Sequence, residues 1–162
     1  MILKTEEELI KAGEELGKTL KPPYFIELVG DVGAGKTTFV KGLARGWGID
    51  DEITSPSYTI SKCYQNNNIT LNHYDFYRLD DPGIMSEDLE ESLNDPDTIT
   101  VVEWADIVRN TTPDMIVKIT IKEDGSRELE IKNNSKTAAS PAKELEWSFI
   151  LTPPTKTVAS SN

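Results

Sequence analysis

A glycine-rich stretch carries residues at the spacing of a phosphate-binding loop. In the sequence LVGDVGAGKTTF, Gly30 is followed after four residues by Gly35, Lys36 and Thr37. Glycines let successive backbone N–H groups converge on phosphate oxygens, and the following helix presents its positive N-terminal end. Lys36 would reach the β and γ phosphates, Thr37 would offer its hydroxyl to Mg²⁺, and Thr38 would lie near the α phosphate. The pattern predicts a nucleotide site, with a chance glycine-rich turn as the alternative, and it does not identify a reaction.

Two carboxylates follow predicted strands, where a magnesium ion or an attacking water needs them. Asp75 comes directly after NITLNHY, and Glu103 comes directly after ITVV. Mg²⁺ prefers few protein oxygens and several waters, so a threonine hydroxyl plus one carboxylate is a sensible set. Either acid alone is equally consistent with a solvated strand end in this acidic chain. Together with the loop they predict a catalytic and metal site.

The segment ITSPSYTI lies between the phosphate loop and Asp75. In many phosphate-loop hydrolases, a loop at this position responds to the γ phosphate. Thr54, Ser55 and Ser57 can supply hydroxyls to such a switch-like loop. From spacing alone, a simple turn at Pro56 that opens a strand is slightly favoured.

Three further residues receive a structural interpretation. His73, the only histidine, has no motif around it that indicates a catalytic or metal partner, and it is interpreted as a strand residue. Tyr77 and Trp104 are interpreted as side chains that pack against the sheet.

The elements that must position these residues follow from apolar periodicity. YFIELV, residues 24–29, reads as the strand before the loop, and residues 37–47 read as the helix after it. Thr5 and Glu8 stand at capping-box spacing and open an amphipathic helix that ends before two prolines.

The second half of the chain is richer in predicted strands. Two hairpins are expected, one around QNNN and one around EDGS, with a strand at residues 98–104 between them. SEDLEESL is expected to form a short helix capped by Ser86. The fold class predicted is α/β, a three-layer fold like that of phosphate-loop NTPases with a mixed central sheet.

A change of composition divides the chain into two predicted parts. Residues 1–132 are expected to form a phosphate-loop NTPase-like domain, and residues 133–162 a C-terminal linker and tail. Within the tail, ELEWSFIL alternates apolar and polar residues and can add one edge strand or dock elsewhere.

Composition limits the class of partner. Among 162 residues there are 17 basic and 28 acidic ones, a net charge of -11 that opposes broad binding to nucleic acid. Any RNA is therefore expected to be held by another protein. The single cysteine, Cys63, favours a reducing cytosol, and neither a membrane span nor a secretion signal is found, so a cytoplasmic protein without a membrane partner is expected.

Four motifs in order, GDVGAGKTT, SPSYT, HYDFYRL and VVEW, resemble the TsaE family over roughly residues 5–131. The phosphate loop is common to many families, but its combination with DFYRL and VEW is highly specific. The resemblance implies a small bacterial ATPase that binds ATP with Mg²⁺ and hydrolyses it slowly. It also implies partnership with TsaB and TsaD, which transfer threonylcarbamoyl to adenosine 37 of tRNA, so that tRNA is met only through that complex.

The resemblance also assigns roles to individual residues. Asp75 would orient or activate water, Lys36 would act in catalysis, and Thr37 with Glu103 would serve Mg²⁺. Thr54 and Ser57 would belong to the switch-like loop. The nucleotide would be held by a larger set: Thr5, Glu6, Asp31, Val32, Gly33, Ala34, Gly35, Lys36, Thr37, Thr38 and Arg127. Ser57 and Tyr58 stand where the family often has threonine and phenylalanine, and the tail has no family counterpart.

Three other functions fit parts of the sequence. GAGKTT also opens many small-molecule kinases, but those bring several arginines to the transferred group, and this chain has only Arg45, Arg78, Arg109 and Arg127. A GTPase is disfavoured because DDPG has no following Asn-Lys-x-Asp motif. A nucleotide-gated interaction module with little intrinsic hydrolysis remains open.

Overall fold

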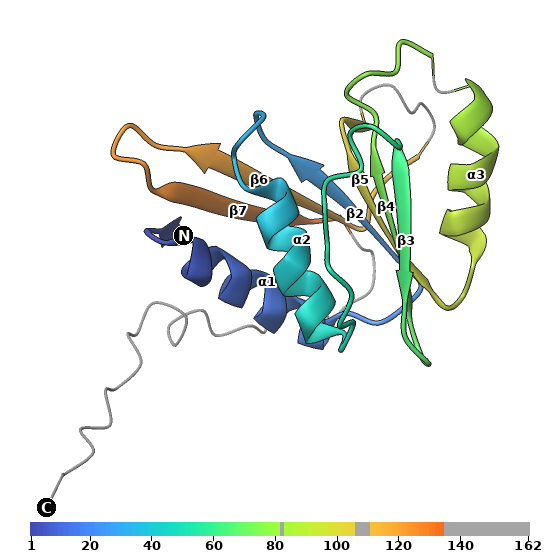
Figure 1. The fold of residues 1–162 in the computed structure, drawn as a ribbon, viewed down its shortest axis with the longest axis horizontal. Helices are drawn as coiled ribbons and strands as arrows, with labels where there is room; N and C mark the ends of the chain where they lie inside the picture. The colour runs from blue at the N-terminus through green and yellow to red at the C-terminus, as the bar shows by residue number, and fades with distance from the viewer. Residues whose placement is uncertain (82, 106–110, 135–162) are drawn as a thin grey trace, which may run out of the picture.

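A computed structural model describes residues 1–81, 83–105 and 111–134. In this part of the chain, seven strands form one sheet in the order β1-β7-β6-β2-β5-β4-β3, with three helices packed on it (Figure 1). The four central strands β6, β2, β5 and β4 are parallel, and antiparallel strands flank them on both sides. The bounds are β1 Ile2–Leu3, α1 Glu6–Thr19, β2 Tyr24–Val29, α2 Lys36–Gly46, β3 Ser61–Gln65, β4 Thr70–Asp75, α3 Gly83–Asn94, β5 Thr98–Glu103, β6 Met115–Ile121 and β7 Arg127–Asn133.

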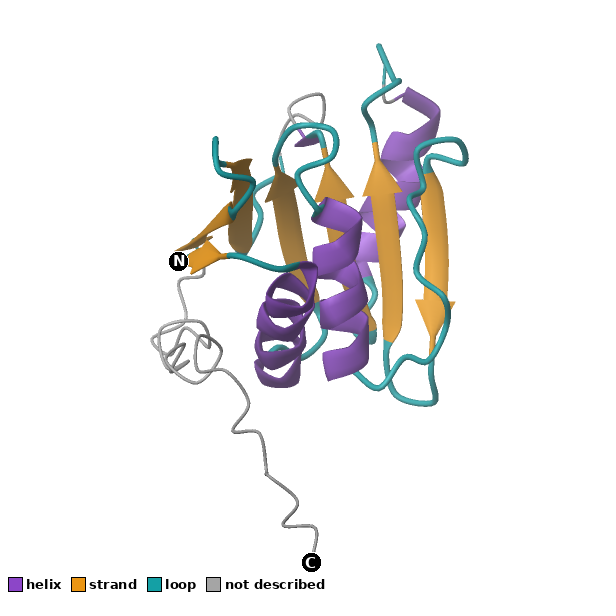
Figure 2. Ribbon diagram, turned by 60° about the vertical axis from the view of Figure 1, so that its left-hand side comes forward, coloured by secondary structure: helices purple, strands orange, loops and turns teal. Residues whose placement is uncertain are grey.

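The helices cover both faces of the sheet, so the fold has three layers. Helices α1 and α2 lie side by side on one face, and α3 lies on the other (Figure 2). The larger apolar core lies under α1 and α2, and a smaller one containing Phe25, Tyr74 and Leu89 lies under α3. The predicted α/β class with a mixed sheet is confirmed.

Helices α1 and α2 approach closely because glycines stand at their contact. A Cβ atom added at Gly13 would lie 2.5 Å from the Phe39 carbonyl oxygen, and one at Gly42 would lie 2.1 Å from the Ile10 carbonyl oxygen. These distances are shorter than any real contact, so only glycine fits. The close packing fixes α2, and with it the loop at its N-terminus, against the body of the protein.

Most predicted elements are present, with two differences. The Thr5 hydroxyl accepts a hydrogen bond from the Glu8 amide at 3.1 Å and caps α1, as the spacing predicted. Ser86 was predicted to cap the N-terminus of the third helix, and this was wrong. Helix α3 begins earlier, at Gly83, and the Ser86 hydroxyl donates to the Gly83 carbonyl at 2.9 Å. Strand β1 was not predicted; it pairs antiparallel with β7.

The two predicted hairpins are formed by β3 with β4 and by β6 with β7. Strand β7 ends at Asn133, next to the predicted boundary of the ATPase domain at residue 132. The proposed edge strand ELEWSFIL lies outside the described residues. No helix in the described ranges is long and apolar enough to cross a membrane.

Candidate functional site

The predicted catalytic residues gather around one cavity at the carboxyl ends of the parallel strands. This edge is where open α/β sheets bind ligands. The cavity has a volume of about 530 Å³, and we call it the phosphate cavity. It is lined by Val32, Gly33, Gly35, Lys36, Thr37, Thr38, Ser55, Ser57, Tyr58, Asp75, Tyr77, Arg78, Glu103 and Trp104.

The glycine-rich loop leaves β2 and turns directly into α2. Gly33 and Gly35 adopt left-handed backbone conformations, with φ of 83° and 106°, which favour glycine. From β7, Arg127 donates through Nε to the Ala34 carbonyl at 2.8 Å and through a terminal nitrogen to the Gly33 carbonyl at 3.4 Å. Arg127 therefore supports the backbone of the loop.

The Lys36 ammonium group lies inside the loop. Its side chain is only 8% exposed, and it donates to the carbonyls of Gly30 and of Asp31, the latter at 3.3 Å. The Nζ atom also lies 5.0 Å from the centre of the Trp104 ring, a cation–π contact. The cation is thus positioned at the base of the phosphate cavity by the loop carbonyls and the Trp104 ring.

Asp75 and Glu103 are direct neighbours in the register of the parallel strands β4 and β5. Asp75 is 7% exposed and accepts hydrogen bonds from the Ser57 hydroxyl at 2.8 Å and the Tyr77 amide at 3.0 Å. The segment containing Ser57 is therefore linked directly to the carboxylate predicted to act on water.

Glu103 has the properties of a metal ligand. It is 2% exposed, and its Oε2 atom lies 3.2 Å from His73 Nε2, but the two are not aligned for a hydrogen bond. Within the part of the chain that the structure describes, Oε2 has no hydrogen-bond partner. A buried carboxylate oxygen without a donor, beside a cavity that Thr37 also lines, is an oxygen set that Mg²⁺ takes. The residues present therefore fit a magnesium ion.

A second cavity of about 330 Å³ lies on the other side of the glycine-rich loop. Thr5, Glu6 and Arg127, which were predicted among the residues that hold the nucleotide, line it. Gly33, Gly35 and Thr38 line both this cavity and the phosphate cavity. The residues predicted to hold the nucleotide therefore lie on both sides of one loop.

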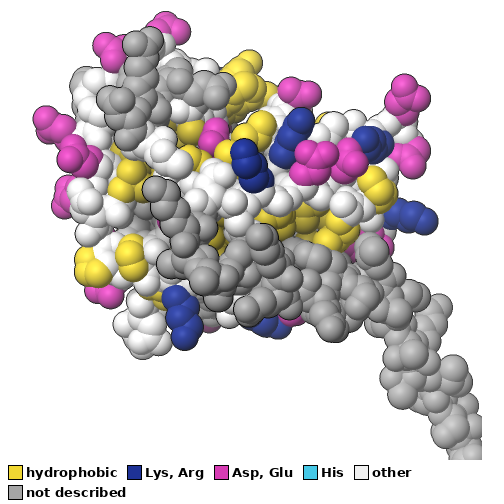
Figure 3. All heavy atoms as spheres, turned by 180° about the vertical axis from the view of Figure 1, so that it is seen from behind, with side chains coloured by type: hydrophobic (Ala, Val, Ile, Leu, Met, Phe, Trp, Pro, Cys, Tyr) yellow, Lys and Arg dark blue, Asp and Glu magenta, His cyan; other side chains and the backbone are white. Residues whose placement is uncertain are grey.

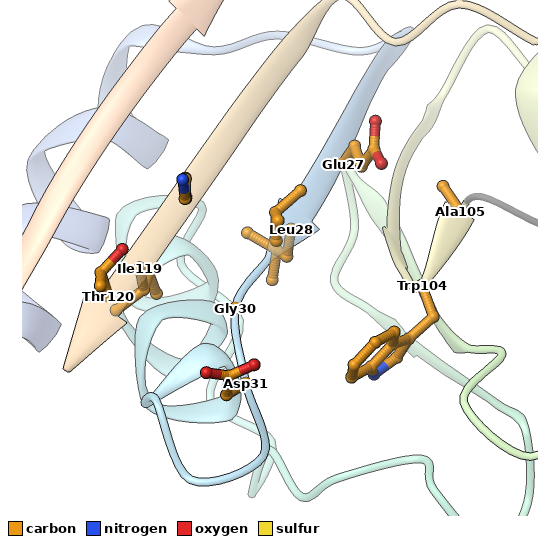
Figure 4. A pocket seen from close by; sticks show the side chains of 10 residues that line it. Glu27, Leu28, Gly30, Asp31, Trp104, Ala105, Ile119 and Thr120 are labelled. Carbon is orange, nitrogen blue, oxygen red and sulfur yellow. The ribbon is translucent and has the colours of Figure 1, made fainter.

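Three predicted site residues line neither of these two cavities. Thr54 accepts a hydrogen bond from Lys62 and is held at β3. Ala34 is buried in the core. Asp31 lines a third cavity, of about 250 Å³, where Figure 4 shows it near Trp104 at the carboxyl ends of β2 and β5.

Four aromatic and basic residues line the phosphate cavity although they were not predicted as site residues. Tyr77 and Trp104 contact each other with ring centres 4.9 Å apart, and the Arg78 guanidinium lies 4.8 Å from the centre of the Tyr58 ring. Trp104 has a left-handed backbone, with φ of 59°, directly after β5. The signal that could have found Tyr77, Arg78 and Trp104 is the pair of short motifs DFYR and EW, which begin at the two carboxylates.

Comparison with known proteins decides the family. The family profile described as "Threonylcarbamoyl adenosine biosynthesis protein TsaE" matches residues 3–131. The chain belongs to the TsaE family. This confirms the resemblance found in the four motifs and associates the chain with threonylcarbamoyladenosine biosynthesis in tRNA.

Individual relatives agree with the TsaE profile. A Rickettsia felis protein named tRNA threonylcarbamoyladenosine biosynthesis protein TsaE is 35% identical over 139 residues, covering 83% of this chain and 80% of that protein. The Bacillus subtilis protein of the same name is 41% identical over 112 residues, or 68% of this chain and 69% of that protein. The crystal structure of Bacillus subtilis YdiB superposes with a TM-score of 0.67 at 30% identity, covering 83% of this chain and 84% of that one.

Proposed function

We propose that this TsaE family member binds ATP with Mg²⁺ and hydrolyses it in support of threonylcarbamoylation of tRNA adenosine 37. In this proposal it acts on a complex of TsaB and TsaD rather than on tRNA directly. ATP is favoured over GTP because the sequence contains no Asn-Lys-x-Asp guanine-binding motif.

One observation carries the proposal. A glycine-rich loop at a helix N-terminus, a buried lysine and two buried carboxylates on adjacent strands all line one cavity. Each group alone has a structural explanation, but their convergence is what phosphoryl transfer requires.

Each residue would have a distinct task. The loop amides and Lys36 bind the phosphate oxygens and compensate the charge that shifts toward the β phosphate. When bound to Thr37 and Glu103, Mg²⁺ supplies further charge neutralisation of the phosphates. Asp75 orients the attacking water and takes its proton as the water oxygen bonds to the γ phosphorus. The bond from phosphorus to the bridging oxygen breaks, and ADP retains the electron pair.

The surface supports indirect contact with tRNA. On the face seen in Figure 3, acidic side chains lie along the margins and the basic side chains are interspersed with acidic ones. Binding to bare nucleic acid depends on basic groups that release counterions, and the net charge of -11 opposes it.

Two alternative functions use the same cavity. A small-molecule kinase would need several arginines at the transferred group, whereas Arg78 alone among the described arginines lines the phosphate cavity. A nucleotide-gated interaction module would use ATP mainly to change its affinity for a partner. The link from Ser57 to Asp75 favours this as the second candidate, because hydrolysis and loop position then share one contact.

A reconstitution tests the proposal. ATP turnover is measured for the protein alone, with TsaB and TsaD, and with Mg²⁺ removed by chelation, alongside tRNA modification in the same mixtures. We expect slow turnover alone, faster turnover with the partners, and none without Mg²⁺. ATP-dependent binding to TsaB and TsaD with negligible turnover would favour the interaction module, and phosphoryl transfer to a small molecule would favour the kinase.

A further inference from the structure

Arg78 stands at the rim of the phosphate cavity, and none of the tasks above uses it. It follows β4 in a tight turn, in which Asp75 accepts from the Tyr77 amide at 3.0 Å and the Leu79 amide donates to the Phe76 carbonyl at 3.0 Å. The turn begins at the predicted catalytic carboxylate. The guanidinium is therefore positioned by the same backbone that positions Asp75.

The contacts of Arg78 differ from those of the other described arginines. Arg45 lies 4.0 Å from Glu7, and Arg127 is bound to the carbonyls of the glycine-rich loop. Arg78 lies 4.8 Å over the Tyr58 ring, and no carboxylate pairs with it in the described ranges. An exposed cation–π contact is weaker than a charge-assisted hydrogen bond to phosphate. A phosphate within reach would therefore bind the guanidinium in place of the Tyr58 ring.

The charges at the phosphate cavity give Arg78 a task. The ionisable groups that line it are the cations Lys36 and Arg78 and the anions Asp75 and Glu103, which sum to zero. Without Arg78, the protein groups of a cavity meant for a triphosphate would carry a net charge of -1 before Mg²⁺ is counted. Lys36 is deep in the loop, whereas Arg78 stands across from it at the rim.

Tyr58 connects Arg78 to the segment of residues 54–58. The Tyr58 side chain is 85% exposed, so its position is not fixed by the core. The same segment is linked to Asp75 through Ser57 at 2.8 Å. Two residues after it, Ile60, a β-branched residue, has an unfavourable left-handed φ of 68°. At Tyr58 itself no core packing opposes a change when Arg78 moves, whereas Thr54, at the other end of the segment, is held by Lys62 and Tyr64.

We propose that Arg78 binds the γ phosphate and, by leaving or returning to Tyr58, makes the position of residues 54–58 depend on whether ATP or ADP is bound. This inference rests on the proposed nucleotide site and adds the residue that distinguishes the two nucleotides. ADP lacks the γ phosphate, so the guanidinium stays on the ring. The ATP-bound and ADP-bound proteins then differ in the position of an exposed aromatic segment. A partner that contacts this segment would bind the two forms with different affinity.

Equilibrium titrations with ATP and with ADP test the proposal. Arg78→Ala should weaken ATP binding about tenfold and change ADP binding less than twofold, so the ratio of the two dissociation constants collapses. Tyr58→Ala removes the competing contact and should tighten ATP binding by about two- to fivefold, the equivalent of an exposed cation–π interaction. Arg45→Ala is the matched control: it removes the same charge from the surface of α2 and should leave both affinities unchanged.

A second readout follows the segment itself. Amide hydrogen exchange at residues 54–60 should differ between the ATP and ADP states in the unaltered protein and become equal in Arg78→Ala. If Arg78→Ala weakens both nucleotides equally, or if the exchange difference persists in it, the proposal is wrong while the nucleotide site stands. If the unaltered protein binds neither nucleotide, the proposed function falls together with this inference.

Discussion

The two sides of the phosphate cavity are held in different ways. On one side, the glycine-rich loop continues into α2, which packs against α1 through glycines that admit no side chain at their contact. On the other side, the segment of residues 54–58 is joined to the turn after β4 through the Ser57 hydroxyl and the Tyr58 ring. The first side depends on backbone packing in the core, and the second on one part-buried hydrogen bond and one exposed aromatic contact.

This difference indicates that one side of the cavity binds the nucleotide and the other side changes position with the nucleotide that is bound. Backbone packing leaves little room for movement, so the loop presents its amides and Lys36 in nearly one geometry. Exposed side-chain contacts are individually weak and exchange readily with water or ligand. The loop side is therefore suited to holding phosphates, and the residue 54–58 side is suited to changing with them.

The largest effect on activity is expected from a change at Lys36, on the side of the cavity formed by the glycine-rich loop. Lys36→Ala should weaken ATP binding and lower hydrolysis at least about a hundredfold, because it removes the positive charge positioned for the β and γ phosphates. Steady-state turnover and ATP titration measure this, with circular dichroism to verify folding. Unchanged turnover would contradict the assignment of the cavity as the nucleotide site.

A second prediction concerns the packing itself. Gly42→Ala places a Cβ atom 2.1 Å from the Ile10 carbonyl oxygen, so α1 and α2 must separate. We expect a loss of about 3 kcal/mol in the free energy of unfolding and a fall of roughly 10 °C in melting temperature.

Gly125→Ala is the matched control for the packing. Its φ of 84° disfavours alanine, but nothing lies within 4 Å of the added carbon, so the cost should be about 1 kcal/mol. Equal losses in the two variants, compared in denaturant titrations, would mean that close helix contact does not hold the loop side.

The third prediction distinguishes the roles of Asp75 and Glu103, which lie between the two sides of the phosphate cavity. Glu103→Ala should weaken Mg²⁺-dependent ATP binding by about tenfold or more, because it removes a buried oxygen that has no hydrogen-bond partner among the described residues. Asp75→Ala should leave ATP binding largely intact and lower hydrolysis about a hundredfold, as expected for loss of the group that activates water. Titrations at several Mg²⁺ concentrations distinguish the two, and the opposite pattern would exchange their roles.

The sequence predicted the packed side better than the responsive side. The strand, loop and helix around Lys36 follow from one local motif, and the two carboxylates follow from the strands that precede them. Strand β1 has only two residues, too few to show the alternation of apolar and polar residues that marks a strand. Its pairing with the distant strand β7 could therefore not be predicted.

The missed site residues depend on tertiary proximity. Arg78 and Tyr58 become neighbours only because β3 and β4 pair and bring their ends together. His73 was assigned no partner, yet it lies beside Glu103 through the register of β4 with β5. Neither relationship is visible in spacing along the chain.

The smallest effect is expected at Ser57, on the responsive side. Ser57→Ala removes a donor at 2.8 Å from Asp75, but the Tyr77 amide remains and the partly exposed site admits water as a replacement. A typical hydrogen bond contributes about 1 kcal/mol net, so hydrolysis should fall by about fivefold while ATP affinity stays unchanged. Ser55→Ala is the control, since its hydroxyl contacts Ser57 at 2.7 Å and makes no direct bond to Asp75; it should change turnover less than twofold. A loss in Ser57→Ala as large as that in Asp75→Ala would mean that the segment of residues 54–58 orients the carboxylate outright, and the contrast between a binding side and a responsive side would not hold.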